Sequence, residues 1–243
     1  MTSHDEVVIF GDIHGNLPAL EAVFADIEEQ HNGARYCLGD LVGYGTFPNE
    51  VVELVREREI PTIMGNYDQG VGQHSDDCGC AYQTETERER GKRSIGWTNE
   101  VITDTNRAYL QDLDSQRRLT LGSLDIVLVH GSPRRVNEYL YEDRADASFE
   151  RMLDAVDADV LVCGHTHLPY HTELPSGRHV INAGSVGKPK DGDPRACYVT
   201  LAANGELAVT FHRVAYDVER AASAIEATDM PDPYADMLRA GEG

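Results

Sequence analysis

Five short polar motifs follow apolar runs along this chain, and their order constrains the fold more than any other feature. They occupy residues 11–16 (GDIHGN), 39–43 (GDLVG), 65–68 (GNYD), 129–131 (VHG) and 164–167 (GHTH). The preceding runs are rich in β-branched residues, which is typical of buried strands. Polar side chains at the ends of several strands predict one shared site at the edge of a sheet.

The motifs contain seven potential metal ligands, all oxygen or imidazole donors: Asp12, His14, Asp40, Asn66, His130, His165 and His167. This set suits Mn, Fe, Ni or Zn rather than a structural cysteine–zinc site. Seven ligands are too many for one ion and suit two when one carboxylate bridges them. Two metals about 3.5–4 Å apart can hold the attacking and leaving oxygens of a displacement at phosphorus. The sequence therefore predicts two divalent cations, Mn first among them.

Strand and helix patterns alternate in the first third of the chain. We expect strands at 6–10, 34–38 and 60–64 and helices at 17–29 and 49–57. This β-α-β-α-β order predicts a parallel sheet with ligands at the carboxyl ends of its strands. Later strand patterns lie at 118–121, 124–129, 160–163, 178–182, 196–201 and 206–214, with helices at 147–156 and 217–227.

These elements favour a single α/β domain over residues 1–243. We expect a four-layer α/β/β/α sandwich of two mixed sheets flanked by helices, since it places the loops of both halves along one edge. The polar segment 69–115, with helices near 85–99 and 103–113, is interpreted as a cap or an edge insertion. The acidic, proline-containing residues 228–243 are interpreted as a mobile tail.

The charge is strongly negative, with 42 acidic against 21 basic residues and a net charge of −21. Lysine occurs only at positions 92, 188 and 190. Such a surface resembles that of proteins from salt-loving organisms, and an ordinary acidic protein is the alternative. The charge disfavours binding to polymeric nucleic acid. No apolar run has the length of a membrane span, and no basic-then-apolar leader opens the chain, so we expect a cytoplasmic protein without a membrane partner.

The five cysteines are scattered, which argues against a disulfide framework. The pair Cys78 and Cys80 lies in a polar loop. It could bind a metal or form a redox pair, and a loop shaped simply by Gly79 is the alternative.

The motif order GD-x-HG, GD-x-x, GN-x-D, H-G and G-H-T-H resembles that of the calcineurin-like metallophosphoesterase superfamily. The most similar branch is the small prokaryotic phosphodiesterases of the YfcE type, and the resemblance spans residues 7–199. It implies the α/β/β/α fold and two metal sites that share Asp40. One metal would take Asp12, His14, Asp40 and His167, and the other Asp40, Asn66, His130 and His165.

The resemblance also implies an activity, the hydrolysis of phosphoric esters by a metal-bound hydroxide. The residues implied as catalytic are Asp40, Asn66, Tyr67, Asp68 and His130, and those expected to contact phosphate are Asn16, Asn66 and Ser185. Lys188 and Lys190 follow Ser185 closely, and Tyr139 and Tyr141 follow the His130 motif. Both pairs are further candidates for contacts with the substrate.

Two departures from the superfamily pattern bear on the substrate. Tyr67 stands where many members have a histidine thought to protonate the leaving group, and tyrosine is a poorer acid near neutral pH. Residues 43–45 read Gly-Tyr-Gly, where the protein phosphatases have Asp-Arg-Gly. That arginine grips a phosphomonoester, so its replacement favours diesters.

We therefore expect a phosphodiesterase acting on a small phosphoester. The alternatives are a dinucleoside polyphosphate or pyrophosphate hydrolase, a protein phosphatase-like monoesterase, a nuclease, and a metal-binding scaffold with weak catalysis. The acidic surface argues against the nuclease. Edge strands in the β-rich last third are compatible with a homodimer.

Overall fold

A computed structural model of the protein describes residues 6–203 and 205–242. Its first sheet has the strand order β2-β1-β8-β9, in which β1 pairs parallel with β2 and antiparallel with β8. The last pair, β8 and β9, is antiparallel. The strands are β1 (Glu6–Phe10), β2 (Ala34–Cys37), β8 (Ala196–Ala203) and β9 (Leu207–Val214).

The second sheet has the order β3-β4-β5-β7-β6. Its middle pairs, β4 with β5 and β5 with β7, are parallel, while the outer pairs are antiparallel. Both sheets are therefore mixed, as the sequence predicts. The strands are β3 (Gln116–Leu121), β4 (Leu124–Val129), β5 (Val160–Cys163), β6 (Tyr170–Glu173) and β7 (His179–Asn182).

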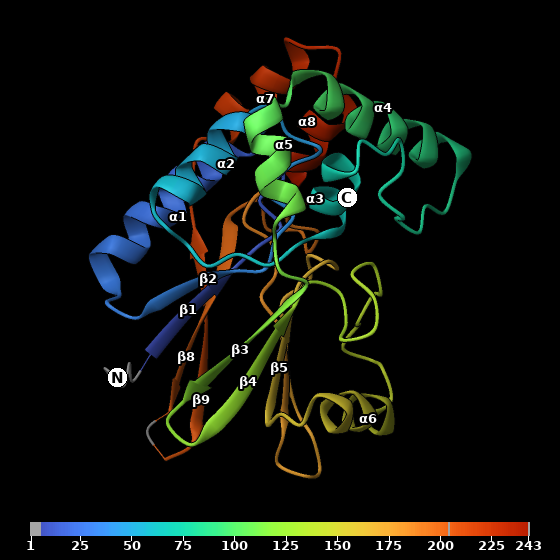
Figure 1. Cartoon of the computed structure of the whole chain (residues 1–243). Helices are drawn as coiled ribbons and strands as arrows, with labels where there is room; N and C mark the ends of the chain where they lie inside the picture. Colours follow the sequence, from blue (N-terminus) through green and yellow to red (C-terminus); the bar gives the residue numbers. More distant parts are fainter. Residues whose placement is uncertain (1–5, 204, 243) are drawn as a thin grey trace.

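The two sheets pack face to face and helices cover their outer faces (Figure 1). Alternation along β1 sends Ile9 into the core between the sheets, against Leu128 and Val162, and Phe10 into the core beneath the helices. Helices α1 (Leu17–Gln30) and α2 (Pro48–Glu57) bury their apolar sides on the first sheet. Helix α6 (Asp146–Val156) covers the second sheet. The predicted four-layer α/β/β/α sandwich is confirmed.

Segment 69–115 packs against the helices that cover the first sheet, while the start of α4 and the loop before it project outward (Figure 1). It contains α4 (Glu85–Val101) and α5 (Asp104–Gln111), and it begins within α3 (Asn66–Gly72), which the sequence analysis did not predict. A capping box between Thr84 and Glu87 starts α4. The predicted helices are therefore present, and α4 and α5 both contact α2.

Two strand predictions differ from the structure. The strand expected at 60–64 is reduced to isolated bridges at Thr62 and Ile63, because Pro61 lacks the N–H that a sheet ladder needs. Strand β6 was missed, since His171, Thr172 and Glu173 lie at a partly exposed sheet edge and carry no apolar pattern.

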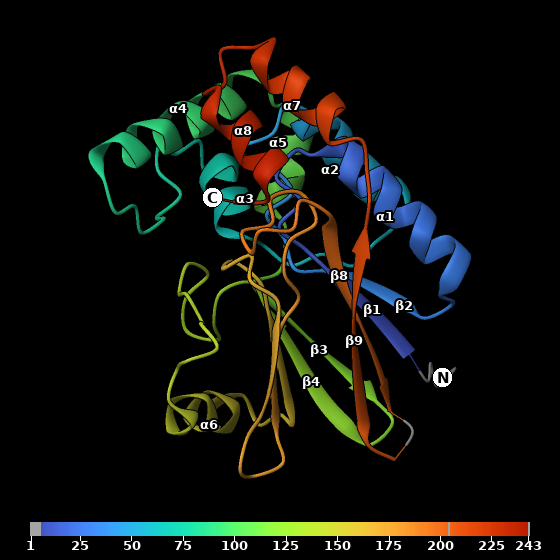
Figure 2. The same cartoon turned by 180° about the vertical axis from the view of Figure 1, so that it is seen from behind.

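Within the tail expected at 228–243, the described residues up to 242 include one helix of eight residues. After α7 (Val218–Glu226), helix α8 (Pro233–Ala240) turns back and packs on it (Figure 2). Tyr234 and Leu238 of α8 are buried with Ile225 of α7. Pro233 is compatible with this helix, because it occupies the first turn of α8, where a missing N–H costs nothing.

Among residues 6–203 and 205–242, no helix combines the length and the apolar character needed to cross a membrane.

Candidate metal centre

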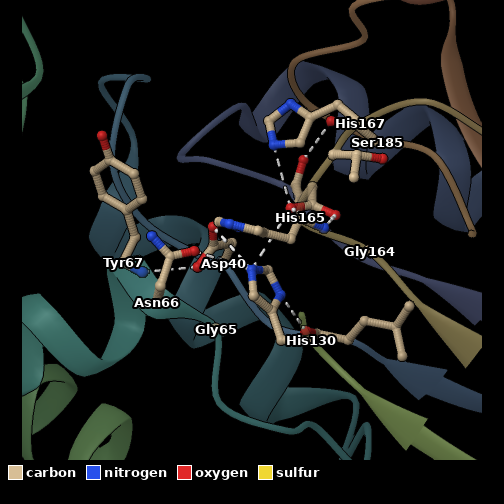
Figure 3. Close-up of polar contacts among 12 residues, drawn as sticks. Asp40, Gly65, Asn66, Tyr67, His130, Gly164, His165, His167 and Ser185 are labelled. Carbon is tan, nitrogen blue, oxygen red and sulfur yellow. Dashed lines mark hydrogen bonds and ion pairs between the residues drawn. The ribbon is translucent and has the colours of Figure 1, made fainter. Parts of the chain in front are cut away.

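The seven predicted ligands lie close together and are buried. They come from loops at the carboxyl ends of strands β1, β2, β4 and β5 and from the start of α3. Figure 3 shows five of them, Asp40, Asn66, His130, His165 and His167. Two groups of three ligands each have their donor atoms within 4.8 Å of one another. The first group is Asp12, His14 and His167, and the second is Asp40, His130 and His165.

Hydrogen bonds to backbone carbonyls fix three of the imidazoles. Nδ1 of His14 lies 3.0 Å from the Val42 oxygen, and Nδ1 of His130 lies 2.8 Å from the Leu38 oxygen. Nδ1 of His167 lies 2.6 Å from the oxygen of Lys188. Because a carbonyl can only accept, each Nδ1 carries the proton. In the neutral form of each ring the lone pair is then on Nε2, which faces the centre, as a metal ligand requires.

Asp40 lies between the two ligand groups. Its Oδ2 is 3.5 Å from Nε2 of His14 in the first group and 3.3 Å from Nε2 of His130 in the second. Its Oδ1 accepts a 2.8 Å hydrogen bond from the backbone N–H of Tyr67. Asn66 also points at the second group, with Oδ1 3.1 Å from Nε2 of His130. A carboxylate in this position fits the predicted bridging ligand.

The nitrogen of His165 that is unpaired among the described residues indicates that the site suits a cation. Its Nε2 is buried and has no hydrogen-bond partner within the described part of the chain. An unsatisfied buried nitrogen costs about 1–3 kcal/mol, and coordination to a metal would remove that cost. The donor set of carboxylate, amide and imidazole groups suits a hard or borderline divalent cation. The residues present therefore fit a metal centre.

The pKa values of the imidazoles keep most of them neutral, which is the form that binds metals. Burial lowers the pKa of His14 to about 3 and holds the pKa values of His165 and His167 well below the ordinary range. Burial acts on His130 in the same direction, but the carboxylates of Asp40 and Asp12 outweigh it and raise its pKa to about 10.

Backbone strain is concentrated at the ligands. Five of the seven have positive φ angles, namely Asp12 (50°), His14 (51°), Asp40 (51°), His165 (66°) and His167 (62°). Residues with a side chain rarely adopt this region, and such strain persists only where surrounding contacts enforce it. Gly65 supplies one of these contacts, because a Cβ there would collide with the Asp40 carboxylate and backbone nitrogen.

Asn16 and Ser185, which we expect to contact phosphate, both make hydrogen bonds within the chain. Asn16 caps α1 by accepting from the N–H of Ala19, and its amide donates to the Gly187 carbonyl and the Tyr216 hydroxyl. The Ser185 hydroxyl donates to the Asp12 carbonyl at 2.7 Å and accepts from the N–H of Lys188. Both side chains are buried and committed to positioning the ligand loops.

Asp68 also positions a ligand loop. Its carboxylate accepts from the N–H groups of Leu41 and Gly65, at 2.8 and 3.0 Å, and so ties the Asp40 loop to the start of α3. The neighbouring Tyr67 is buried, with its hydroxyl 3.1 Å from that of Tyr82. Burial raises the pKa of Tyr67 well above its ordinary value, which makes it a still weaker acid near neutral pH.

The loop of Cys78 and Cys80 contacts Asn66. The Asn66 amide donates to the Cys78 carbonyl at 3.0 Å and to Sγ of Cys80 at 3.4 Å, and the two sulfurs lie 3.2 Å apart as free thiols. The loop therefore orients the Asn66 side chain, so that its oxygen faces His130.

A cavity of about 380 Å³ lies beside the centre. Three of its lining residues contact candidate ligands. The Tyr139 ring lies against His165, with centroids 4.1 Å apart and planes inclined by 42°, and the Tyr44 ring lies 4.8 Å from His14. The carbonyl of Lys188 accepts a hydrogen bond from His167. Tyr82 and Arg90 line it from segment 69–115, and Tyr234 lines it from α8. The last three carry no motif, so only their place in the fold reveals them.

Comparison with known proteins shows to which family this chain belongs. A family model of the calcineurin-like phosphoesterase superfamily domain matches residues 6–206. The chain belongs to this superfamily. The prediction made from the motif order is therefore confirmed, and with it hydrolysis of phosphoesters as the general chemistry. The family and the two buried ligand groups together indicate a dinuclear site for divalent metals.

Three relatives of this calcineurin-like phosphoesterase match nearly its full length. An uncharacterized protein of Methanocaldococcus jannaschii is 31% identical over 252 residues, covering 97% of this chain and 98% of the relative. A metallophosphoesterase from Sphaerobacter thermophilus is 31% identical with a TM-score of 0.75, and a hypothetical protein from Pyrococcus horikoshii OT3 is 25% identical with a TM-score of 0.84. Each structure match covers 97% of this chain and 98% of the other.

Proposed function

We propose that this calcineurin-like phosphoesterase is a phosphodiesterase that acts on a small phosphoester with two divalent metal ions, Mn first among the candidates. The observation that carries the proposal is the position of Asp40, whose carboxylate reaches both buried ligand groups. Asp12, His14 and His167 would hold one ion, and Asn66, His130 and His165 the other. When bound, such a pair stabilises charge on phosphoryl oxygens and lowers the pKa of water.

The chain's own residues preorganise this site. Carbonyl partners fix the imidazoles of His14, His130 and His167, so their Nε2 atoms do not need to reorient. The aromatic rings of Tyr44 and Tyr139 lie against His14 and His165 and restrict the movement of these imidazoles. Tyr67 contributes mainly through its backbone N–H to Asp40, since its buried phenol is a poor acid.

The preference for a diester rests on two features. Tyr44 packs its ring against His14 at the position where the protein phosphatases have their phosphomonoester-gripping arginine. A buried phenol at Tyr67 also favours substrates whose leaving group needs little protonation. A diester carries one negative charge on the reacting phosphate where a monoester carries about two near neutral pH, so it depends less on such an arginine.

The test compares bis-p-nitrophenyl phosphate with p-nitrophenyl phosphate in high salt, with Mn²⁺ supplied and then removed by a chelator. We expect release of nitrophenolate that requires the metal and a higher kcat/KM for the diester. A higher kcat/KM for the monoester would refute the diester preference. Turnover of neither ester, with two metals bound per chain, would refute the phosphodiesterase and leave the pyrophosphatase or the metal-binding scaffold.

A further inference from the structure

Two of the chain's three lysines line the cavity beside the metal centre. Lys188 and Lys190 both face it, whereas Lys92 is exposed elsewhere on α4. In a protein with a net charge of −21, a pair of lysines beside a phosphoesterase site is a marked local reversal of charge. Arg90 of α4 adds a third positive group to the same cavity.

Lys188 has no anionic partner among residues 6–203 and 205–242. Lys188 is 4% exposed, and its ammonium makes no hydrogen bond or ion pair with any of the described residues. The groups around Nζ are the rings of Tyr44 and Tyr234, whose centroids lie 5.1 and 5.9 Å away. An ammonium that faces a cavity without a carboxylate partner suits an anion that comes from outside the chain.

The backbone fixes Lys188 at this position. Its carbonyl accepts from His167 and its N–H donates to Ser185, so the lysine is held directly behind a metal ligand. One carboxylate, Glu87, also lines the cavity, but its Oε2 accepts from the N–H groups of Gln83 and Thr84 at the start of α4. That oxygen therefore caps the start of α4 and is not paired with Lys188.

Aromatic rings form another wall of the cavity. Tyr139 and Tyr141 stack with centroids 5.8 Å apart and planes inclined by 12°, and Tyr141 is 47% exposed. The exposed ring of Tyr141 suits contact with a flat organic group, and about 380 Å³ is within the range of small-molecule sites.

We propose that Lys188 and Lys190 form an anion subsite that binds a second phosphate of the substrate, while Tyr139 and Tyr141 hold an aromatic group of the same molecule. The substrate class is then an aromatic organic phosphoester with a phosphate beyond the one that reacts. This inference rests on the proposed function for the reacting phosphate, but the subsite itself consists only of side chains of this chain.

The test uses metal-free, chelator-treated protein, so that it depends on neither turnover nor metal. Phenyl phosphate is titrated by calorimetry into the wild type, Lys188→Met, Lys190→Met and the control Lys92→Met. We expect saturable binding to the wild type and to the control, and a dissociation constant about tenfold higher in each cavity variant, as the loss of one charge-assisted hydrogen bond implies. Lys188→Arg should restore much of the affinity.

Tyr141→Ala separates the two parts of the subsite. It should weaken binding of phenyl phosphate and leave the binding of inorganic phosphate unchanged. Thermal unfolding of each variant verifies that it is folded. Equal affinity of the wild type and both cavity variants, or no binding of phenyl phosphate to the wild type, would overturn the subsite. A failure of the proposed hydrolysis is seen only in the metal-loaded assay and leaves this result unaffected.

Discussion

At the residue scale, the metal centre depends on close backbone approaches that allow strained ligands to face one another. Asp40 holds a φ of 51°, and Gly65 lies so near that it leaves no space for a Cβ. Asp68 joins these two loops by accepting from Leu41 and Gly65. The ligand geometry is therefore enforced by contacts between loops rather than by the local preference of each ligand residue.

The substitution Gly65→Ala tests this dependence. The added methyl group collides with Asp40, so we expect a loss of about 1–3 kcal/mol in stability and markedly weaker metal binding. Gly96→Ala is the matched control, since a Cβ at this helical position meets nothing within 4 Å. The control should be stabilised by about 0.5–1 kcal/mol. Chemical unfolding and metal titration of both variants measure the effects, and normal metal affinity in Gly65→Ala would contradict the account.

His212 makes stability depend on pH away from the metal centre. Burial and the neighbouring His31 lower its pKa, while Asp26 and Glu6 act in the opposite direction, and its Nε2 lies 3.0 Å from the Thr200 hydroxyl. Below pH about 6.5 the unfolded chain binds more protons at this residue than the folded chain does, so the free energy of unfolding falls as the pH drops.

His212→Gln should therefore show a shallower loss of stability between pH 7 and 5 than the wild type. Urea unfolding at a series of pH values measures both slopes. Identical slopes would mean that His212 titrates alike in the folded and unfolded chains.

The sequence was sufficient to identify all seven candidate ligands, because each lies in a short polar motif directly after an apolar run. It could not predict the roles of Asn16 and Ser185. Their hydrogen-bond partners, such as Gly187 for Asn16 and Asp12 for Ser185, are more than 100 residues away along the chain. Such contacts follow from tertiary packing and leave no local pattern.

At the scale of elements, α8 supports the domain and closes the cavity. Leu238 is buried against α7, while Tyr234 of the same helix lies beside Lys188. The acidic composition and the prolines around α8 concealed this helix in the sequence, because its amphipathic pattern is only two turns long. The strand expected at 60–64 failed for a similar reason, since its apolar composition did not show that Pro61 interrupts the ladder.

Leu238→Ala tests the packing of α8. Removing this buried side chain should lower the free energy of unfolding by about 2–3 kcal/mol. Asp236→Ala, on the exposed side of the same helix, should change it by less than about 0.5 kcal/mol. Chemical unfolding measures both variants, and a Leu238→Ala protein as stable as the wild type would show that α8 does not support the fold.

At the scale of the whole molecule, the layered sandwich explains why the sequence predicts the two sheets and the shared site but does not predict the cavity. Strand periodicity defines two sheets, and the order of the motifs brings their loops to one edge. The cavity is different, because its wall combines residues such as Arg90 of α4, Tyr139 of a loop and Tyr234 of α8. These residues share no motif and come together only in the folded chain.

The net charge of −21 acts on the whole molecule by self-repulsion. Because salt screens exposed like charges, we expect the unfolding temperature to rise when NaCl is increased from about 0.1 M to 1 M, where the Debye length falls from about 10 to 3 Å. Thermal unfolding at constant pH measures this effect. An unfolding temperature that falls with added salt would show that attractive ion pairs, such as Arg178 with Asp154, outweigh the repulsion.

The central claim is that one bridging carboxylate joins two metal sites, and metal stoichiometry tests it most directly. The protein is reconstituted with Mn²⁺, desalted and analysed for metal per chain, beside Asp40→Asn and the exposed control Asp143→Asn. We predict two ions per chain in the wild type and the control, and at most one in Asp40→Asn, with phosphodiester hydrolysis lost. One ion per chain in the wild type, or two in Asp40→Asn with full activity, would contradict the account.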